Sequence, residues 1–314
     1  MLVNIKIFDI KIIRGKVGMN LEDLRVFKEV AKEGNITKTA ENLNFVQSNV
    51  TAKMKRLEQN YGTKFFYRHR HGVTLTSPGK ILLSYAEQVL LLMDEAEKTL
   101  KSSDFPNGTL SIGSMETTVA TRLPNILSTY HDQYPQVELS LRTGTTEALI
   151  KAALNREIDG AFVAGEINHP ELEEMEVFEE ELVLLAKKNI LSAIDFDQLK
   201  NQTIIVFESG CFYRDIFEKW LKSKGISPSK LMELNTLDGV IGCVKAGLGI
   251  SLLTKSVADQ LNKDENIKQF TLPKEYGTIS TKFINHKDIA KTSAFCEFIR
   301  VINSSGCINV TVTS

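Results

Sequence analysis

Residues 34–68 read GNITKTAENLNFVQSNVTAKMKRLEQNYGTKFFYR, and this stretch predicts two helices joined by a tight corner. The side chain of Asn35 can cap a first helix over 36–43 by accepting from free backbone N–H groups. After the corner, a second helix is expected over 47–60. Gly62 is placed to end it, because glycine readily adopts the left-handed conformation of a helix C-terminus.

The second helix has two different faces. Its apolar positions are spaced four, three and four apart, which predicts one buried stripe made of Val50, Met54, Leu57 and Tyr61. The opposite face carries small or polar side chains, namely Ser48, Ala52, Lys55 and Gln59, flanked by Thr51 and Arg56. Small groups first and positive charges later suit a helix that reads base edges and holds phosphates. A plain surface αα-corner would show the same spacing.

Basic charge is concentrated around this helix pair. From Lys38 to Lys80 the chain has eight Lys or Arg residues and two acids, a local charge of +6. The whole chain has a formal charge of −1, so the rest sums to −7. Such a concentration is expected of a phosphate-binding surface and favours DNA binding over a plain corner.

Residues 20–79 resemble the N-terminal domain of a LysR-type transcriptional regulator. The matching residues are Asn20-Leu21, Leu24, Phe27, Val30-Ala31, Gly34, Thr37, Ala40, Leu43, Gln47-Ser48, Val50, Leu57-Glu58, Gly62, Phe66, Arg68, Leu75-Thr76 and Pro78-Gly79. The sequence departs from the usual family pattern at Asn35 and Thr51, where serine is commoner, and at Val46, where a hydroxyl cap is usual. The resemblance implies a winged helix-turn-helix whose second helix enters a DNA groove.

The predicted DNA-contacting residues are Thr37, Lys38, Gln47, Ser48, Asn49, Thr51, Ala52, Lys55, Arg56, Arg68 and Arg70. Of these, Gln47 is the best suited to a bidentate contact with adenine. Arg68 and Arg70 belong to a basic cluster in a short β-wing with Gly72 at its tip. In a wing these arginines would face phosphates or the minor groove, or else form a merely solvated basic loop.

The 314 residues suggest two or three compact units. We expect an N-terminal extension at 1–18, the winged helix-turn-helix at 19–77, a linker helix at 78–107 and an effector-binding domain at 108–307. The extension lies outside the resemblance, so either translation starts at Met19 or the extension adds a strand. A purine-rich ribosome-binding sequence could encode Arg14-Gly15, at a suitable distance before the Met19 codon.

Composition narrows the class of protein further. The four cysteines show no metal-ligand spacing, which predicts a reduced cytoplasmic protein without a metal. No apolar run approaches the roughly 20 residues of a membrane span. The chain also lacks the common nucleophile, zinc, phosphate-loop and dinucleotide motifs, so we expect neither an enzyme nor a cofactor. A solute-binding transport protein would need export and has no use for residues 20–79.

A long helix is expected from Ser77-Pro78 to about Ser102, because a hydroxyl cap and proline mark its start. Its apolar positions follow a three-four spacing, and extra leucines widen the stripe. The resemblance implies that this helix pairs with its counterpart in a second subunit, giving a dimer or tetramer on an interrupted palindrome. The alternative is that the helix packs only onto its own domain.

From Thr109 onward, short strands alternate with helices, which predicts parallel sheets in an α/β domain. The resemblance implies two lobes like those of type 2 periplasmic binding proteins, with lobe I at about 108–181 and 273–307 and lobe II at about 182–272. We expect strands 181–187 and 267–272 to cross between them. A small-molecule effector would bind in the cleft where strand ends and helix starts converge.

Five residues are the predicted effector contacts: Ser114, Thr117, Thr145, Ser209 and Arg214. Arg214 is the predicted anion partner, and a small carboxylate is the favoured ligand class. The alternative is ordinary helix capping with a surface arginine. Cys211 lies close to where the peroxide-sensing branch of the family carries its reactive cysteine. The spacing differs by one residue, and the next cysteine is as far away as Cys243, so a structural cysteine is the favoured interpretation.

Overall fold

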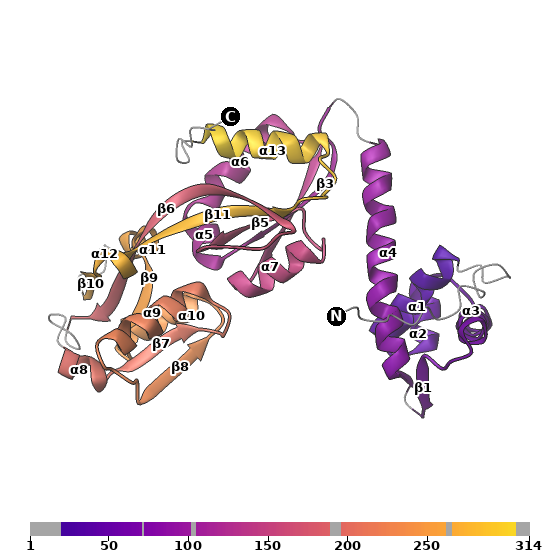
Figure 1. Ribbon diagram of the computed structural model, residues 1–314, viewed down its shortest axis with the longest axis horizontal. Coiled ribbons are helices and arrows are strands. Elements are labelled where there is room, and N and C mark those ends of the chain that lie inside the picture. Colours follow the sequence, from indigo (N-terminus) through magenta and orange to yellow (C-terminus); the bar gives the residue numbers. More distant parts are fainter. Residues whose placement is uncertain (1–19, 71, 102–104, 189–195, 262–265, 306–314) are drawn as a thin grey trace, which may run out of the picture. The chain divides into compact units, whose positions relative to one another are not determined.

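The computed structural model describes residues 20–70, 72–101, 105–188, 196–261 and 266–305 (Figure 1). The chain divides into two compact units, Met1–Ala96 and Glu97–Ser314. The extension at 1–18, with the start-site hypothesis, lies outside the described residues. Among the helices that the structure describes, none combines the length and apolar character required to cross a bilayer.

The N-terminal unit is a winged helix-turn-helix followed by a long helix. Its elements are α1 (Leu21–Glu33), α2 (Ile36–Asn42), α3 (Gln47–Tyr61), β1 (Phe66–His69), β2 (Gly72–Leu75) and α4 (Ser77–Lys101). The Asn35 side chain accepts from the N–H groups of Thr37 and Lys38 at 2.9 and 3.1 Å, which caps α2 as predicted. Gly62 ends α3 with φ 61°, also as predicted.

Helices α1 and α3 pack their apolar faces into one core. Leu24, Phe27 and Val30 of α1 are buried there with Val50, Met54 and Leu57 of α3. The fourth residue of the predicted stripe, Tyr61, is 45% exposed, so that part of the prediction was wrong. Its ring reaches only the edge of the core, where it meets Phe65 at 5.8 Å between centroids.

The wing is held close to the turn between α1 and α2. Strands β1 and β2 pair antiparallel, with His69 opposite Gly72. The Val73 N–H donates to the Gly34 carbonyl at 2.8 Å, and a Cβ added at Gly72 would lie 2.1 Å from that oxygen. Only glycine fits there, because the backbone also has φ 142°. Gly72 is therefore the first residue of β2, beside the tip of the wing.

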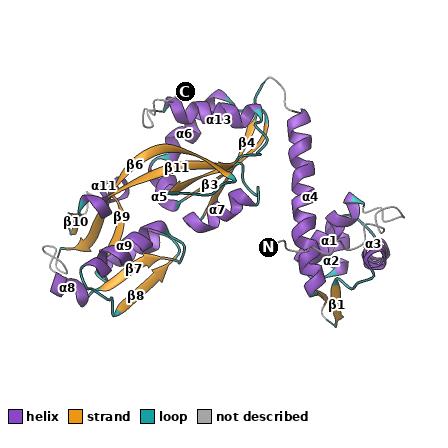
Figure 2. Cartoon of the chain, viewed as in Figure 1, coloured by secondary structure: helices purple, strands orange, loops and turns teal. Residues whose placement is uncertain are grey.

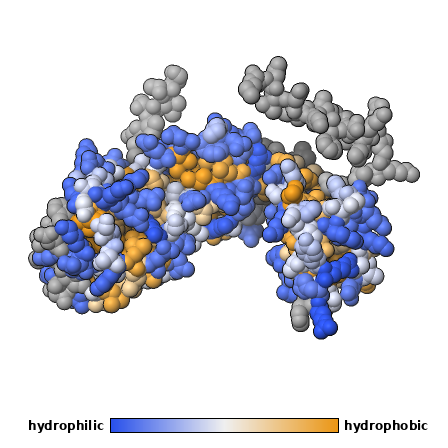
Figure 3. Space-filling view, turned by 60° about the horizontal axis from the view of Figure 1, so that its bottom comes forward, coloured by the Kyte–Doolittle hydropathy of each residue, from blue (hydrophilic) through white to orange (hydrophobic). Residues whose placement is uncertain are grey.

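Helix α4 has one face packed into the N-terminal unit and another exposed. Thr76 starts it by accepting from the Gly79 N–H at 3.0 Å. Its packed side chains are Leu82, Leu83, Ala86, Val89 and Leu90. Its large exposed apolar side chains are Ile81, Tyr85, Leu92 and Met93. The helix therefore packs onto its own domain and still keeps an unpartnered apolar face. Figure 3 shows orange apolar areas that interrupt a largely hydrophilic surface.

The C-terminal unit contains helices and strands in alternation (Figure 2). Its strands are β3 (Gly108–Ser114), β4 (Val137–Thr143), β5 (Gly160–Ala164), β6 (Leu172–Lys187), β7 (Thr203–Phe207), β8 (Lys230–Leu234), β9 (Ser251–Thr254), β10 (Ile267–Thr271) and β11 (Thr278–His286). Its helices are α5 (Glu116–Thr121), α6 (Leu123–Gln133), α7 (Thr146–Leu154), α8 (Phe196–Lys200), α9 (Phe212–Ser223), α10 (Leu237–Ala246), α11 (Lys255–Gln260), α12 (Lys274–Gly277) and α13 (Ser293–Ser304).

The sheets are mixed rather than parallel throughout. Strand β3 pairs parallel with β4 and β5, and β7 pairs parallel with β8. Strand β11, in contrast, runs antiparallel to both β5 and β6. The prediction of parallel sheets was therefore wrong for β6 and β11, because β11 brings the chain back from lobe II beside β6 and in the opposite direction.

The strand β6 connects the two lobes. Residues 172–181 pair with β11 in lobe I, and residues 182–187 pair with β9 and β10 in lobe II. The first predicted crossing, 181–187, therefore names only the lobe II end of a longer strand. The second, 267–272, was wrong: β10 stays in lobe II beside β6, and the chain returns through α12 into β11. Figure 1 shows β6 and β11 running together.

Alternation along single strands fills the cores on both sides of the sheet. In β5, Ala161 and Val163 join the core that contains α7, while Phe162 joins the core formed with α6 and α13. In the second half of β6, Leu184 joins one core and Val183 and Leu185 the other. Strands buried on both faces read as continuous apolar runs, which is why 182–186 is so recognisable in the sequence.

Candidate nucleic-acid interface and effector site

Helix α3 presents the predicted polar face to solvent. Gln47, Ser48, Asn49, Ala52 and Lys55 are exposed, and Thr51 is half-buried. The N-terminal turns offer short amide and hydroxyl groups without charge, as the sequence predicted. Val46 begins the helix without a side-chain cap, so the first N–H groups of α3 are left for water or for another acceptor. A phosphate oxygen is one such acceptor.

An ion-pair cluster locks α3 to α1. Asp23 of α1 is fully buried, and it accepts from Arg56 Nε at 2.9 Å and from Arg56 Nη2. Lys53 of α3 is also buried and lies 3.5 Å from Asp23 and 2.8 Å from the exposed carboxylate of Glu22. The Lys53 ammonium also lies over the Phe45 ring, 5.7 Å from its centroid. Two cations of α3 therefore hold the helix in place.

This cluster changes the role expected of Arg56. The sequence predicted that Arg56 contacts DNA, but its guanidinium is held by Asp23, and that hydrogen bond raises the pKa of Arg56. The carboxylate occupies Nε and Nη2 and balances the charge of the guanidinium, although the Arg56 side chain is still 52% exposed. A phosphate contact by Arg56 stays a prediction, and the geometry assigns Arg56 first to positioning α3.

Other cations near the helix pair are neutralised as well. Lys38 pairs with Glu33, which raises the pKa of Lys38 through their hydrogen bond, and Lys64 pairs with Glu58 at 2.8 Å. In the part of the chain that the structure describes, Lys55, Arg68 and Arg70 make no ion pair. The local charge of +6 therefore overstated the free positive charge, because several partner acids lie on α1, before residue 38.

Lys55 provides a direct test of the phosphate contacts. Lys55→Ala is expected to weaken binding to specific and random duplexes alike and to reduce the salt slope by about one. Thr51→Ala should instead lower the ratio of specific to random binding by about tenfold, since it alters a group at the base-reading turns. Fluorescence anisotropy with both duplexes at several salt concentrations distinguishes the two effects. If Lys55→Ala left the salt slope unchanged, Lys55 would not contact phosphate.

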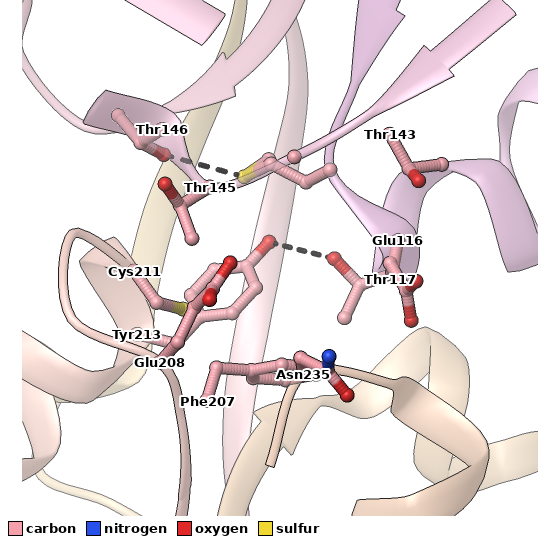
Figure 4. A pocket seen from close by; sticks show the side chains of 12 residues that line it. Glu116, Thr117, Thr143, Thr145, Thr146, Phe207, Glu208, Cys211, Tyr213 and Asn235 are labelled. Carbon is pink, nitrogen blue, oxygen red and sulfur yellow. Dashed lines mark hydrogen bonds between the residues drawn. The ribbon is translucent and has the colours of Figure 1, made fainter. Parts of the chain in front are cut away.

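A cavity of about 180 Å³ lies between the lobes of the C-terminal unit (Figure 4). Its lining residues are Met115, Glu116, Thr117, Thr143, Gly144, Thr145, Thr146, Phe207, Glu208, Cys211, Tyr213 and Asn235. They lie at or shortly after the carboxyl ends of the parallel strands β3, β4, β7 and β8. This is where ligand sites form in α/β folds, so the cavity is the candidate effector site.

Only two of the predicted effector contacts line this cavity, Thr117 and Thr145. Ser114 is fully buried, and its hydroxyl donates to the Met115 carbonyl at 3.2 Å. Ser209 is exposed and does not belong to the lining. The sequence located the right segments, since the missed residues Glu116, Thr143 and Glu208 are their immediate neighbours. Asn235 was missed, although the sequence offered a signal for it. It follows the end of β8, as Thr145 follows the end of β4.

Arg214 does not belong to the lining either. Its guanidinium donates to Glu218 at 2.8 Å, to Glu233 at 2.6 Å and to the Phe207 carbonyl at 3.2 Å. Hydrogen bonding to Glu218 is the main cause of its raised pKa. The arrangement gives no support to Arg214 as an anion partner, because two carboxylates already balance its charge. Glu218 lies one turn further along α9, and Glu233 lies on β8.

Hydrogen bonds connect the lobes across the cavity. The hydroxyls of Thr117 in lobe I and Tyr213 in lobe II lie 3.1 Å apart (Figure 4). Burial raises the pKa of Tyr213, so the phenol stays protonated at neutral pH. The Glu116 carboxylate accepts from the Leu237 N–H at 2.6 Å, at the start of α10. These two hydrogen bonds close one side of the cavity. A change in the angle between the lobes would have to break or lengthen them.

Cys211 has the character of a structural cysteine. It is 9% exposed, and burial raises the pKa of its thiol, although hydrogen bonds from the Arg214 and Tyr213 backbone act in the opposite direction. A reactive thiolate needs a lowered pKa and access to solvent. Desolvation outweighs these hydrogen bonds, so the geometry favours the structural cysteine over a reactive one.

Comparison with known proteins agrees with both halves of this structure. Residues 21–80 match the family described as "Bacterial regulatory helix-turn-helix protein, lysR family", and residues 103–305 match "LysR substrate binding domain". The chain belongs to the LysR family. It is a DNA-binding transcriptional regulator of the LysR type with a ligand-sensing domain.

Several LysR-type relatives align over nearly the whole chain. The transcriptional regulator GltR of Bacillus subtilis is 45% identical over 283 residues, covering 90% of this chain and 95% of GltR. The regulator SoxR of Arthrobacter is 40% identical over 287 residues, covering 91% and 98%. The crystal structure of CbnR, a LysR family transcriptional regulator, has a TM-score of 0.67 with 21% identity, covering 91% of this chain and 98% of CbnR. At that identity CbnR supports the fold alone.

Proposed function

We propose that this LysR-type regulator binds promoter DNA as a dimer or tetramer and alters that binding when a small molecule enters the interlobe cavity. The observation that carries the proposal is the division of α3 into a buried face and an exposed polar one. Gln47, Ser48, Asn49 and Thr51 select bases, and Lys55, Arg68 and Arg70 hold phosphates. The protein acts in the cytoplasm, where the DNA is, and its role is regulatory rather than catalytic.

A dimer with two-fold symmetry matches the symmetry of an interrupted palindrome in the DNA. The apolar residues left exposed on α4 pair with a second copy, which places two recognition helices on two half-sites. A structure of CbnR with its target DNA is similar in fold, with a TM-score of 0.69 and 21% identity, covering 91% of this chain and 99% of CbnR. An effector shifts the angle between lobes and so changes the spacing of the DNA-binding units.

The test is binding of the full-length protein to the promoter upstream of its own gene. At physiological salt we expect about a thousandfold preference for that fragment over random duplex of equal length. A protein with no preference, whether or not a panel of small metabolites is added, would contradict the proposal. A duplex with the same composition in shuffled order is the matched control.

A further inference from the structure

We infer that the interlobe cavity takes a small molecule bearing a protonated amino group, and that Glu208 receives this group. The inference rests on the proposed effector-sensing role and adds the chemical class of the ligand. It replaces the small carboxylate that the sequence favoured.

The charged side chains around the cavity favour a cation over an anion. The lining contains the carboxylates of Glu116 and Glu208 and, among the residues that the structure describes, no lysine, arginine or histidine. The arginine expected there, Arg214, is held outside the lining by Glu218 and Glu233. An anionic ligand would place its charge beside these two like charges, and no basic side chain of the described lining would balance it.

The two carboxylates have different roles. Glu116 accepts from the Leu237 N–H at the N-terminus of α10, where the helix dipole favours a negative charge. Its charge is therefore used within the protein. The Glu208 carboxylate makes no hydrogen bond or ion pair within the described residues, and it lines the same cavity (Figure 4). Glu208 is thus the available counter-charge for a cationic group.

The rest of the lining suits a short molecule with both polar and apolar parts. Thr143 and Asn235 offer a hydroxyl and an amide, while Met115 and Phe207 offer apolar surface. A cavity of about 180 Å³ suits a short molecule such as an amino acid or a small amine. An amino acid and a short amine both carry the ammonium group that Glu208 would bind.

The experiment uses full-length protein and follows the unfolding of the C-terminal unit by the fluorescence of Trp220. This single tryptophan lies in the core of that unit and is 1% exposed. The probes are the protein amino acids, ethanolamine and putrescine, together with the amino-free acids acetate, propionate, succinate and glutarate. We expect at least one amine-bearing compound to raise the midpoint by about 5 °C at a hundredfold excess over its Kd. The four amino-free acids, which match glycine, alanine, aspartate and glutamate without their amino groups, should have no effect.

Variants assign the binding to one residue. Glu208→Gln keeps the shape of the side chain and should weaken binding of that compound at least tenfold, with an unchanged midpoint in its absence. Glu179→Gln is the matched control, because Glu179 is exposed on β6 and lies outside the cavity lining. It should bind like the unmodified protein.

Three outcomes would overturn the inference: equal binding by Glu208→Gln, stabilisation by amino-free acids alone, or no stabilisation by any probe. These outcomes differ from failure of the proposed function. Stabilisation by an amino-free acid, combined with an altered preference for the upstream promoter, would keep effector sensing and reject only the ammonium class. Loss of any promoter preference would reject the regulatory proposal itself. A response to amines but not to amino acids, or the reverse, identifies the source of the ammonium group.

Discussion

Asp23→Ala is expected to lower the free energy of local opening of the recognition helix by about 3 kcal/mol. This corresponds to roughly a hundredfold faster amide exchange in α3. The variant removes a fully buried carboxylate and leaves the buried Lys53 with only the exposed Glu22 as a partner. Removing one member of a buried ion pair costs much more than an exposed pair contributes, because the remaining charge stays desolvated. Affinity for the specific duplex should fall as the ordered state of α3 becomes less populated.

Glu22→Ala is the matched control for Asp23→Ala. Glu22 is the adjacent residue, it contacts the same lysine, and its side chain is 51% exposed, so its loss should cost less than about 1 kcal/mol. Hydrogen–deuterium exchange of α3 peptides measures both variants. Trp220 fluorescence serves as an internal reference, because that residue lies in the other unit and its unfolding should not change. Equal exchange in the two variants would show that Asp23 does not position α3.

The helix-turn-helix could be predicted closely from local chemistry, because its limits depend on neighbouring residues. Asn35 caps α2 and Gly62 ends α3, and both act within one turn of their own position. The pairing of Arg56 could not be predicted in this way. Its partner Asp23 lies 33 residues earlier, and a helical wheel places Arg56 beside the exposed face without showing what α1 presents to it. Side-chain partners that come from tertiary packing are not encoded in spacing.

The effector domain shows the same limit. Bounds of single strands such as β4, β5 and β7 were predictable, since β5 and β7 are short apolar runs and β4 alternates apolar and polar residues. The connection through β6 was not, because a 16-residue strand with an acidic first half reads as two segments. For the cavity, the carboxyl ends of the strands indicated its place. Arg214 was misplaced because position in the chain does not show to which side of a helix the guanidinium turns.

Tyr85→Glu combined with Leu92→Glu is expected to abolish dimerisation and to weaken binding to a two-half-site duplex by about a thousandfold. The two side chains are 63% and 50% exposed on α4, seven residues apart, so they lie on one face with Ile81. A monomer would leave this stripe exposed to water as a contiguous apolar surface, and such surfaces mark sites of protein–protein contact. Charges at its centre would meet like charges across a two-fold axis.

Comparing duplexes with one and two half-sites tests whether affinity falls because the second half-site contact is lost. Binding of the double variant to a single half-site should match that of the unmodified protein, because α3 is unchanged and only the linked second contact is lost. Glu87→Lys is the control, since this exposed residue lies on the polar side of α4, away from the stripe. Inserting five base pairs between the half-sites should remove the advantage of the unmodified dimer by turning one site to the opposite side of the duplex. Sedimentation measures the dimer, and anisotropy measures DNA binding. A double variant that stayed dimeric would exclude the exposed face of α4 as the subunit interface.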